Sequence, residues 1–327
     1  MADTHDTLPR PLLVALALGI VYVVWGSTYL AIRVMVEDMP PMLSAGGRFL
    51  FAAVLLGALL AARFGVRRLR VTRAELAGSA LLGLLLPALG NGVVTVAEHR
   101  GAPSGIAALL VAALPLWVMV YRLASGDRPG RWTVAGVLLG FGGLAGLVLS
   151  TGVGGTVPIG ASLLVVLATL AWSFGSWFQP RLRLPRDPFV TTVWEMLTGG
   201  AILAVAGLTM GERVSLSSYS AASWWAWGYL VVFGSVVAFS AYVWALGNAP
   251  ISLVATYAYV NPVVAVFLGW LILAEPVTWP IAVGGGVVVT AVAVVVGAER
   301  PSLRRTPAPS TREPTAAPRT STDEFAA

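Results

Sequence analysis

Long apolar stretches alternate with short polar connections over residues 12–297. A hydrocarbon core about 30 Å thick needs roughly 20 apolar residues of helix. Pro, Gly and Arg positions divide the chain into ten segments of that size: 12–32, 42–62, 76–97, 104–121, 132–150, 159–178, 189–210, 224–246, 251–273 and 280–297. Hydrophobicity is continuous within each segment, which disfavours a transmembrane β-barrel. The pattern predicts an all-α integral membrane protein with ten transmembrane helices.

Composition agrees with this fold class and excludes several functions. Of 327 residues, 57% are apolar and 11% charged, with a mean hydropathy of +0.82, which is too little charge for the surface of a soluble protein. Cysteine and lysine are absent and histidine occurs twice, which argues against a metal site and excludes a Walker A motif. We expect no cofactor and no metal.

The basic residues, all arginine, indicate the orientation. Seventeen arginines lie in the leader 1–11, in alternate connections and in the tail 298–327, three lie on the opposite side, and Arg48 lies within a span. Because cytoplasmic loops carry the positive excess, both termini are predicted in the cytoplasm, and the protein in the cytoplasmic (inner) membrane. Since the arginines fall between spans, we expect no nucleic-acid partner despite the net charge of +6. The tail is rich in Pro, Ser, Thr and Ala and is expected to be disordered.

The chain contains an internal repeat. An offset of 147 residues superimposes five pairs of scarce residues: Trp25 on Trp172, Pro41 on Pro188, Pro103 on Pro250, Pro115 on Pro262, and Trp132 on Trp279. Residues 12–150 and 159–297 then form two units of five spans each. An odd number of spans gives the units opposite polarity, and inverted repeats are a recurrent architecture of secondary transporters.

Several short segments resemble a known family. They are Trp25-Gly-Ser-Thr-Tyr-Leu-Ala-Ile-Arg33, Asn91-Gly-Val-Val-Thr-Val-Ala-Glu-His99, Ala102-Pro103-Ser104-Gly105, Tyr257-Ala-Tyr-Val-Asn261-Pro262 and Glu275-Pro276. Over nearly all of residues 12–297 the chain is similar to the EamA family of the drug/metabolite transporter superfamily, in its YedA-like branch. The resemblance implies a ten-helix inner-membrane carrier of two EamA repeats, usually an exporter of amino acids, metabolites or small drugs. The chain departs from the family after the fourth span, where Asp127-Arg128 replaces a Glu aligned with Glu275.

Two charges within spans are the first candidates for transport, because a charge in the bilayer costs at least about 2.5–3.5 kcal/mol. Arg48 and Glu195 occupy equivalent positions in the two repeats. Arg48 suits a substrate carboxylate, and Glu195 suits an ammonium group or a coupling proton. The alternative is that each is held by polar groups of the bundle. Opposed helices place the two charges about 12 Å apart along the membrane normal, so a direct salt bridge is marginal.

Further candidates lie near the middle or ends of spans. Asn91 either binds substrate or joins helices, and Glu98 is a second candidate for proton coupling, although a solvated loop carboxylate is the simpler interpretation. Pro115 and Pro262 should kink spans four and nine at equivalent depth. Hydroxyl, amide or aromatic groups that could line a cavity near these kinks are those of Trp25, Trp172, Tyr257, Tyr259 and Asn261, with packing as the alternative for the tryptophans.

These observations favour a secondary transporter, an exporter of small metabolites such as amino acids or amphipathic drugs that works by alternating access. Its expected partners are a small-molecule substrate and membrane lipid. Spans five and ten should pack together or form a homodimer contact through Gly136 and Gly140. The rival from another class is a membrane-embedded lipid-modifying enzyme, which would normally show a constellation of His, Asp or Cys near one interface. A scaffold or sensor is a third alternative, but it leaves the equivalent positions of the repeat without a purpose.

Overall fold

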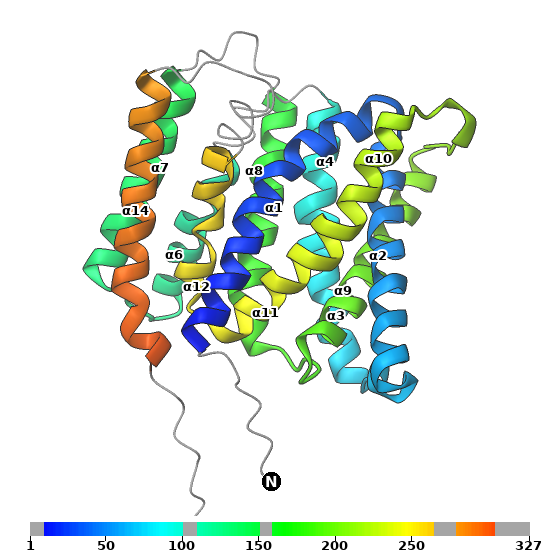
Figure 1. Ribbon diagram of the computed structural model, residues 1–327, viewed down its shortest axis with the longest axis horizontal. Coiled ribbons are helices and arrows are strands. Elements are labelled where there is room, and N and C mark those ends of the chain that lie inside the picture. The colour runs from blue at the N-terminus through cyan, green and yellow to red at the C-terminus, as the bar shows by residue number, and fades with distance from the viewer. Residues whose placement is uncertain (1–9, 101–109, 151–158, 265–278, 305–327) are drawn as a thin grey trace, which may run out of the picture.

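The computed structural model describes residues 10–100, 110–150, 159–264 and 279–304, and all regular structure in these ranges is helical (Figure 1). Two of the elements, η2 and η5, are π-helical segments inside longer helices. The first repeat contains α1 (Arg10–Asp38), α2 (Pro41–Phe64), α3 (Arg73–Gly83), η2 (Leu84–Gly92), α4 (Val93–His99), α6 (Leu114–Ala124) and α7 (Arg131–Ser150). The second contains α8 (Ile159–Phe178), α9 (Pro188–Thr209), α10 (Ala221–Tyr229), η5 (Leu230–Phe239), α11 (Ser240–Asn248), α12 (Ile251–Val254) and α14 (Trp279–Arg304).

These helices confirm the predicted membrane-spanning fold. Seven helices within the described ranges are long and apolar enough to cross a bilayer, two of them formed by α3, η2 and α4 and by α10, η5 and α11. The 20-residue α7 and two shorter apolar helices, Leu114–Ala124 and Ile251–Val264, occupy the described parts of spans five, four and nine. Together they give a fold of about ten membrane helices arranged as two repeats.

The two repeats pack as an inverted pair. Helices α1 and α8, which begin the two repeats, run in opposite directions (Figure 1). Repeat-equivalent helices pair with each other, α2 with α9 and α7 with α14, while α1 packs on α10, η5 and α11 as α8 packs on η2 and α4. We call the side on which α1 begins and α14 ends the terminal side, and the opposite side the distal side (Figure 1).

The pairing of spans five and ten is confirmed, but the two predicted glycines serve different neighbours. A Cβ atom at Gly136 would lie 2.7 Å from the side chain of Val295 and 3.1 Å from the backbone oxygen of Ala291, so Gly136 allows α7 to approach α14. A Cβ atom at Gly140 would lie 2.7 Å from the ring of Tyr259. Gly140 therefore makes room for span nine instead of α14.

Spans four and nine break at positions that are not equivalent in the two repeats, and kinks at Pro115 and Pro262 themselves stay a prediction. In span four a turn at 112–113 precedes α6, and Pro115 lies in the first turn of that helix, where its missing N–H costs nothing. In span nine the turn at 255–256 lies six residues before Pro262. The Thr256 hydroxyl donates to the backbone oxygen of Leu253 at 2.6 Å and is 2.6 Å from the Tyr22 hydroxyl, and these bonds favour the turn at this point.

The last helix is longer than predicted. α14 continues to Arg304, seven residues beyond the expected end of span ten at residue 297, so the first part of the predicted tail is helical. Glu299 explains the extension, because it bonds to Thr133 of α7 at 3.2 Å and pairs with Arg122 of α6 at 3.4 Å. Residues 1–9 of the leader, residues 305–327 of the tail, Pro103 and Glu275 lie outside the described residues.

Candidate functional site

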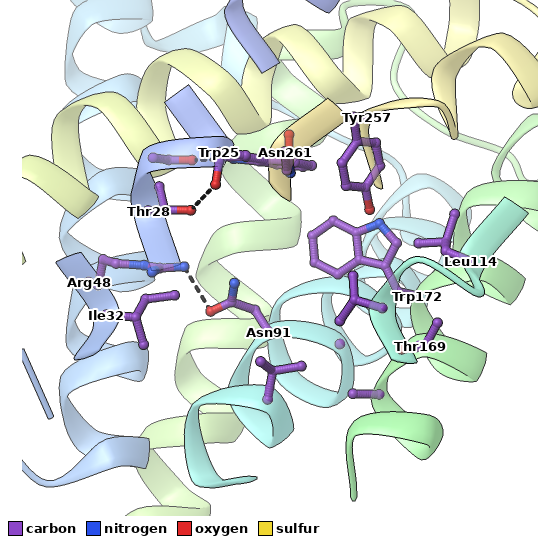
Figure 2. A pocket seen from close by; sticks show the side chains of 15 residues that line it. Trp25, Thr28, Ile32, Arg48, Asn91, Leu114, Thr169, Trp172, Tyr257 and Asn261 are labelled. Carbon is purple, nitrogen blue, oxygen red and sulfur yellow. Dashed lines mark hydrogen bonds between the residues drawn. The ribbon is translucent and has the colours of Figure 1, made fainter. Parts of the chain in front are cut away.

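A cavity lies at the centre of the bundle, between the two repeats (Figure 2). The cavity and its mouth, including the part that is open to solvent, enclose about 670 Å³ not filled by atoms. Every spanning segment of the first repeat except α7, together with α8, η5 and span nine, contributes to its wall: Trp25, Thr28, Ile32, Arg48, Gly90, Asn91, Val94, Val111, Leu114, Ala168, Thr169, Trp172, Gly234, Tyr257 and Asn261.

Six of the eight substrate-binding candidates line this cavity, and they come from both repeats: Trp25, Arg48, Asn91, Trp172, Tyr257 and Asn261. The repeat explains why these distant residues meet. Trp25 and Trp172 are equivalent by the offset of 147 residues, and both lie on the wall of the cavity.

Arg48 provides the cavity with a positive charge. Its side chain is 4% exposed, and its Nη2 donates to Asn91 Oδ1 at 2.9 Å (Figure 2). The Nε atom has no hydrogen-bond partner, and no carboxylate in the described ranges forms an ion pair with this guanidinium. A buried cation without a counter-ion is costly. The arrangement therefore favours an anionic ligand group, with Asn91 fixing the direction of the guanidinium.

Aromatic rings form the cavity wall away from Arg48. The indoles of Trp25 and Trp172 meet edge to face with ring centroids 5.5 Å apart, and Tyr257 lies 5.0 Å from Trp25. Both indole N–H groups are already used, since Trp25 Nε1 donates to the oxygen of Gly234 at 3.1 Å and Trp172 Nε1 to the Tyr242 hydroxyl at 2.9 Å. The indoles therefore offer the cavity their apolar surfaces and π faces.

Asn261 adds a polar group to the same cavity. The residue is 1% exposed, and its Oδ1 atom has no hydrogen-bond partner in the described part of the chain. An unpaired buried acceptor is unfavourable unless a ligand or water supplies a donor. The cavity thus combines a cation, an amide acceptor and an aromatic wall, which suits a small amphipathic molecule with polar groups of both kinds.

The remaining candidates lie outside the cavity. Tyr259 is fully buried and donates to the oxygen of Val137 on α7 at 2.9 Å, so it joins span nine to α7. Glu98 is half-buried near the end of α4 and interacts electrostatically with Arg33. Glu195 is fully buried in α9 but does not reach Arg48, since the two form no ion pair.

Sequence reasoning missed the two π-helical segments beside the cavity. The offset of 147 residues places η2 (Leu84–Gly92) on residues 231–239, and η5 spans Leu230–Phe239. Gly90 and Asn91 of η2 and Gly234 of η5 line the cavity. π-Helical turns are frequent at functional sites. The two segments share no local sequence signal that predicts a π-helix, since Pro87 occurs only in η2.

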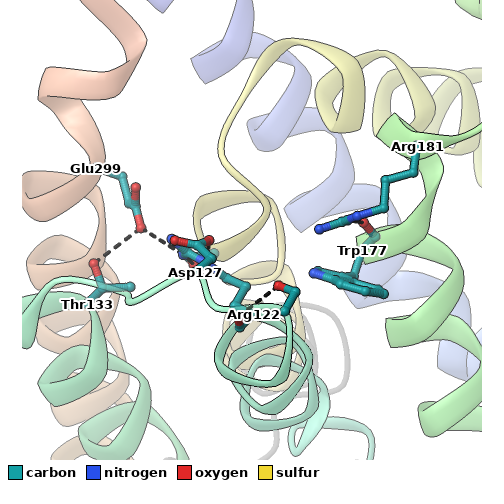
Figure 3. Close-up of polar contacts among 8 residues, drawn as sticks. Arg122, Asp127, Thr133, Trp177, Arg181 and Glu299 are labelled. Atoms are coloured by element: carbon teal, nitrogen blue, oxygen red, sulfur yellow. Dashed lines mark hydrogen bonds and ion pairs between the residues drawn. The ribbon is translucent and has the colours of Figure 1, made fainter.

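A polar cluster ties four helices together on the terminal side (Figure 3). Arg122, at the end of α6, donates from Nε to Asp127 at 2.7 Å, bonds to Ser252 of α12 and pairs with Glu299 of α14. Thr133 of α7 donates to the same glutamate. This cluster gives Asp127 a structural partner and joins spans four, five, nine and ten below the cavity.

Comparison with known proteins agrees with this architecture. The model of the EamA-like transporter family matches residues 12–149 and 159–297. The inner membrane transporter YedA of Escherichia coli (strain K12) is 41% identical over 257 residues, which cover 77% of this chain and 80% of YedA. A protein of the same strain named "Probable amino-acid metabolite efflux pump" is 26% identical over 79% of this chain and 86% of its own length. A crystal structure that shares 21% identity superimposes with a TM-score of 0.69 over 88% of this chain and 98% of that chain, which shows a common fold.

Proposed function

Because the chain belongs to the EamA-like transporter family, we propose that the transported molecule is a small amphipathic metabolite with an anionic group, of the amino-acid type, and that the protein exports it. The protein is a multi-pass inner-membrane transporter. The proposal of an anionic substrate rests on Arg48, because this residue is a buried cation in the central cavity that lacks a carboxylate partner among the described residues.

Each wall of the cavity has a role in this proposal. Arg48 binds the carboxylate of the substrate through charge-assisted hydrogen bonds, and Asn261 accepts a hydrogen bond from its amino group. The rings of Trp25, Trp172 and Tyr257 pack against the apolar part of the substrate and exclude water. Export of an amino-acid derivative is supported by the name of the Escherichia coli efflux pump.

Alternating access is supported by the inverted packing of the repeats. Since α1, η2 and span four line the cavity together with their counterparts α8, η5 and span nine, an exchange of the two conformations opens the cavity to the opposite side. We place both termini in the cytoplasm, because the arginine-rich connections lie on the terminal side. In this account the protein is a carrier without a catalytic step, in agreement with relatives that are named transporters or efflux pumps.

The test is transport by the purified full-length chain in proteoliposomes, with a panel of labelled amino acids and amphipathic amines. We expect saturable flux of at least one carboxylate-bearing compound. Arg48→Gln should weaken its transport about 10–100-fold, because a hydrogen bond to a charged group contributes about 1.5–3 kcal/mol. Arg213→Gln, which removes an exposed arginine outside the cavity, is the matched control. Absence of saturable flux for every compound, or equal flux in wild type and Arg48→Gln, would contradict the proposal.

A further inference from the structure

Glu195 is a fully buried acidic residue in a membrane-spanning helix of the described chain. It lies in the middle of α9 with 0% of its surface exposed, and neither carboxylate oxygen has a hydrogen-bond partner within the described ranges. An ionised carboxylate in such surroundings would lose its hydration without compensation, at a cost of several kcal/mol. A neutral carboxylic acid avoids most of this cost. The side chain therefore fits its surroundings as an acid that holds a proton.

Among the described residues, no positive charge forms an ion pair with Glu195 to offset its burial. The elements that pack on α9 are α2, α3, η2 and α11. Arg48 of α2 forms no ion pair with Glu195, and η2 carries no titratable side chain. Of the remaining charged residues of α2 and α3, Arg63 and Arg73 are exposed to solvent, and Glu75 is half-buried with its carboxylate bonded to Thr72. Tyr242 of α11 lies close enough to Glu195 to interact with it electrostatically, and the two form no hydrogen bond in this conformation.

Tyr242 has only one hydrogen to donate, and its present partners already use it. Ser176 donates its own hydroxyl hydrogen to the oxygen of Trp172 at 2.7 Å, so in its 2.5 Å bond with Tyr242 the serine must accept. Trp172 Nε1 donates to the Tyr242 oxygen at 2.9 Å. Tyr242, which is also hydrogen-bonded to Tyr257, thus receives from Trp172 and donates to Ser176, which leaves it no hydrogen to donate to an ionised Glu195.

The same tyrosine contacts the wall of the cavity. Its ring lies 5.5 Å from that of Tyr257, 5.6 Å from that of Trp172 and 4.9 Å from that of Trp25. All three neighbours line the cavity. A change in the hydrogen bonding of Tyr242 therefore acts on residues that form the aromatic wall of the cavity.

We propose that Glu195 carries the coupling proton of transport and that Tyr242 is the positioning residue that links its protonation to the cavity. In the present conformation the carboxylic acid is neutral and Tyr242 donates to Ser176. When the bundle opens and water reaches Glu195, the O–H bond breaks and the proton passes to water. The carboxylate then becomes an acceptor, the Tyr242 hydrogen turns from Ser176 to Glu195, and the wall of the cavity relaxes. This inference rests on the proposed carrier function and adds its coupling ion.

Infrared difference spectroscopy on the full-length protein in lipid nanodiscs tests the proton directly and needs no substrate. In a Glu98→Gln background, which removes the other candidate for a protonated carboxyl group, we expect at neutral pH the carbonyl band of a protonated carboxylic acid, which is lost in Glu195→Gln and retained in Glu212→Gln. Ser176→Ala keeps Glu195 but frees the hydrogen of Tyr242, so the band should move to lower frequency, and Tyr242→Phe should cancel that move. A band that persists in Glu195→Gln, or a Ser176→Ala spectrum identical to that of the wild type, would overturn the proposal.

A transport measurement separates this inference from the proposed function. For a labelled amino acid that the wild type carries, Glu195→Gln should lose accumulation driven by a pH gradient while counterflow exchange continues at a comparable rate. Accumulation that still follows the pH gradient in Glu195→Gln contradicts the coupling role. Failure of the wild type to carry any compound contradicts the carrier proposal instead, and the infrared result is independent of it.

Discussion

A close approach between the repeats gives a quantitative prediction, because α2 and α9 touch through glycines. A Cβ atom at Gly46 would lie 2.8 Å from the backbone nitrogen of Ala204 and 2.9 Å from the backbone oxygen of Gly200. Both neighbours are backbone atoms and cannot rotate away. Gly46→Ala therefore forces the two helices apart, at the cost of about 1–3 kcal/mol expected for overpacking.

The adjacent glycine provides the matched control. A Cβ atom at Gly47 would meet only a ring atom of Trp227 at 3.9 Å, an ordinary contact. Both substitutions gain about 1 kcal/mol of helix propensity, so the difference between them isolates the crowding at Gly46. Thermal unfolding of the detergent-solubilised protein, followed by tryptophan fluorescence, should place Gly46→Ala below Gly47→Ala on the order of 2–6 °C. Equal unfolding temperatures would refute the direct backbone contact between α2 and α9.

Three further substitutions test contacts elsewhere in the bundle. Glu212 accepts hydrogen bonds from the first backbone N–H groups of α2 at 2.7 and 3.1 Å, so Glu212→Ala should cost about 1 kcal/mol of stability, while Glu37→Ala, at an exposed neighbour, should be neutral in the same melting assay. Tyr259→Phe should lower stability by about 1 kcal/mol through loss of its buried bond to α7, and an unchanged unfolding temperature would count against that bond. Arg122→Ala breaks the terminal-side cluster and should increase protease cleavage between α6 and α7, whereas Arg128→Ala, at an exposed site, should cleave as the wild type does.

The repeat allowed much of the cavity to be predicted from the sequence. Trp25 and Trp172 are equivalent by the 147-residue offset, and the structure brings their rings into contact. Arg48 and Glu195 are equivalent by the same offset, yet they do not meet. The offset fixes the depth of a residue along its helix but not the direction of its side chain, and Arg48 lines the cavity while Glu195 lies in the packing of α9.

Features that depend on contacts between distant segments could not be predicted. The break in span nine lies at Thr256, which bonds to Tyr22, 234 positions away, and it does not coincide with Pro262. The extension of α14 depends on Glu299 reaching Arg122, which hydropathy does not report. Tyr242 was missed for the same reason, because its hydrogen-bond partners Trp172, Ser176 and Tyr257 lie on other helices and form no local motif.

The most direct test of the account is whether the central cavity reaches both sides of the membrane. The chain lacks cysteine, so Thr169→Cys, in the wall of the cavity, introduces a single thiol that a membrane-impermeant maleimide can label from either side of oriented vesicles. Arg213→Cys, in the distal connection between α9 and α10 (Figure 1), controls for vesicle orientation and should react from one side only. Alternating access predicts that Thr169→Cys is labelled from both sides. Labelling of Thr169→Cys from a single side under all conditions would contradict it.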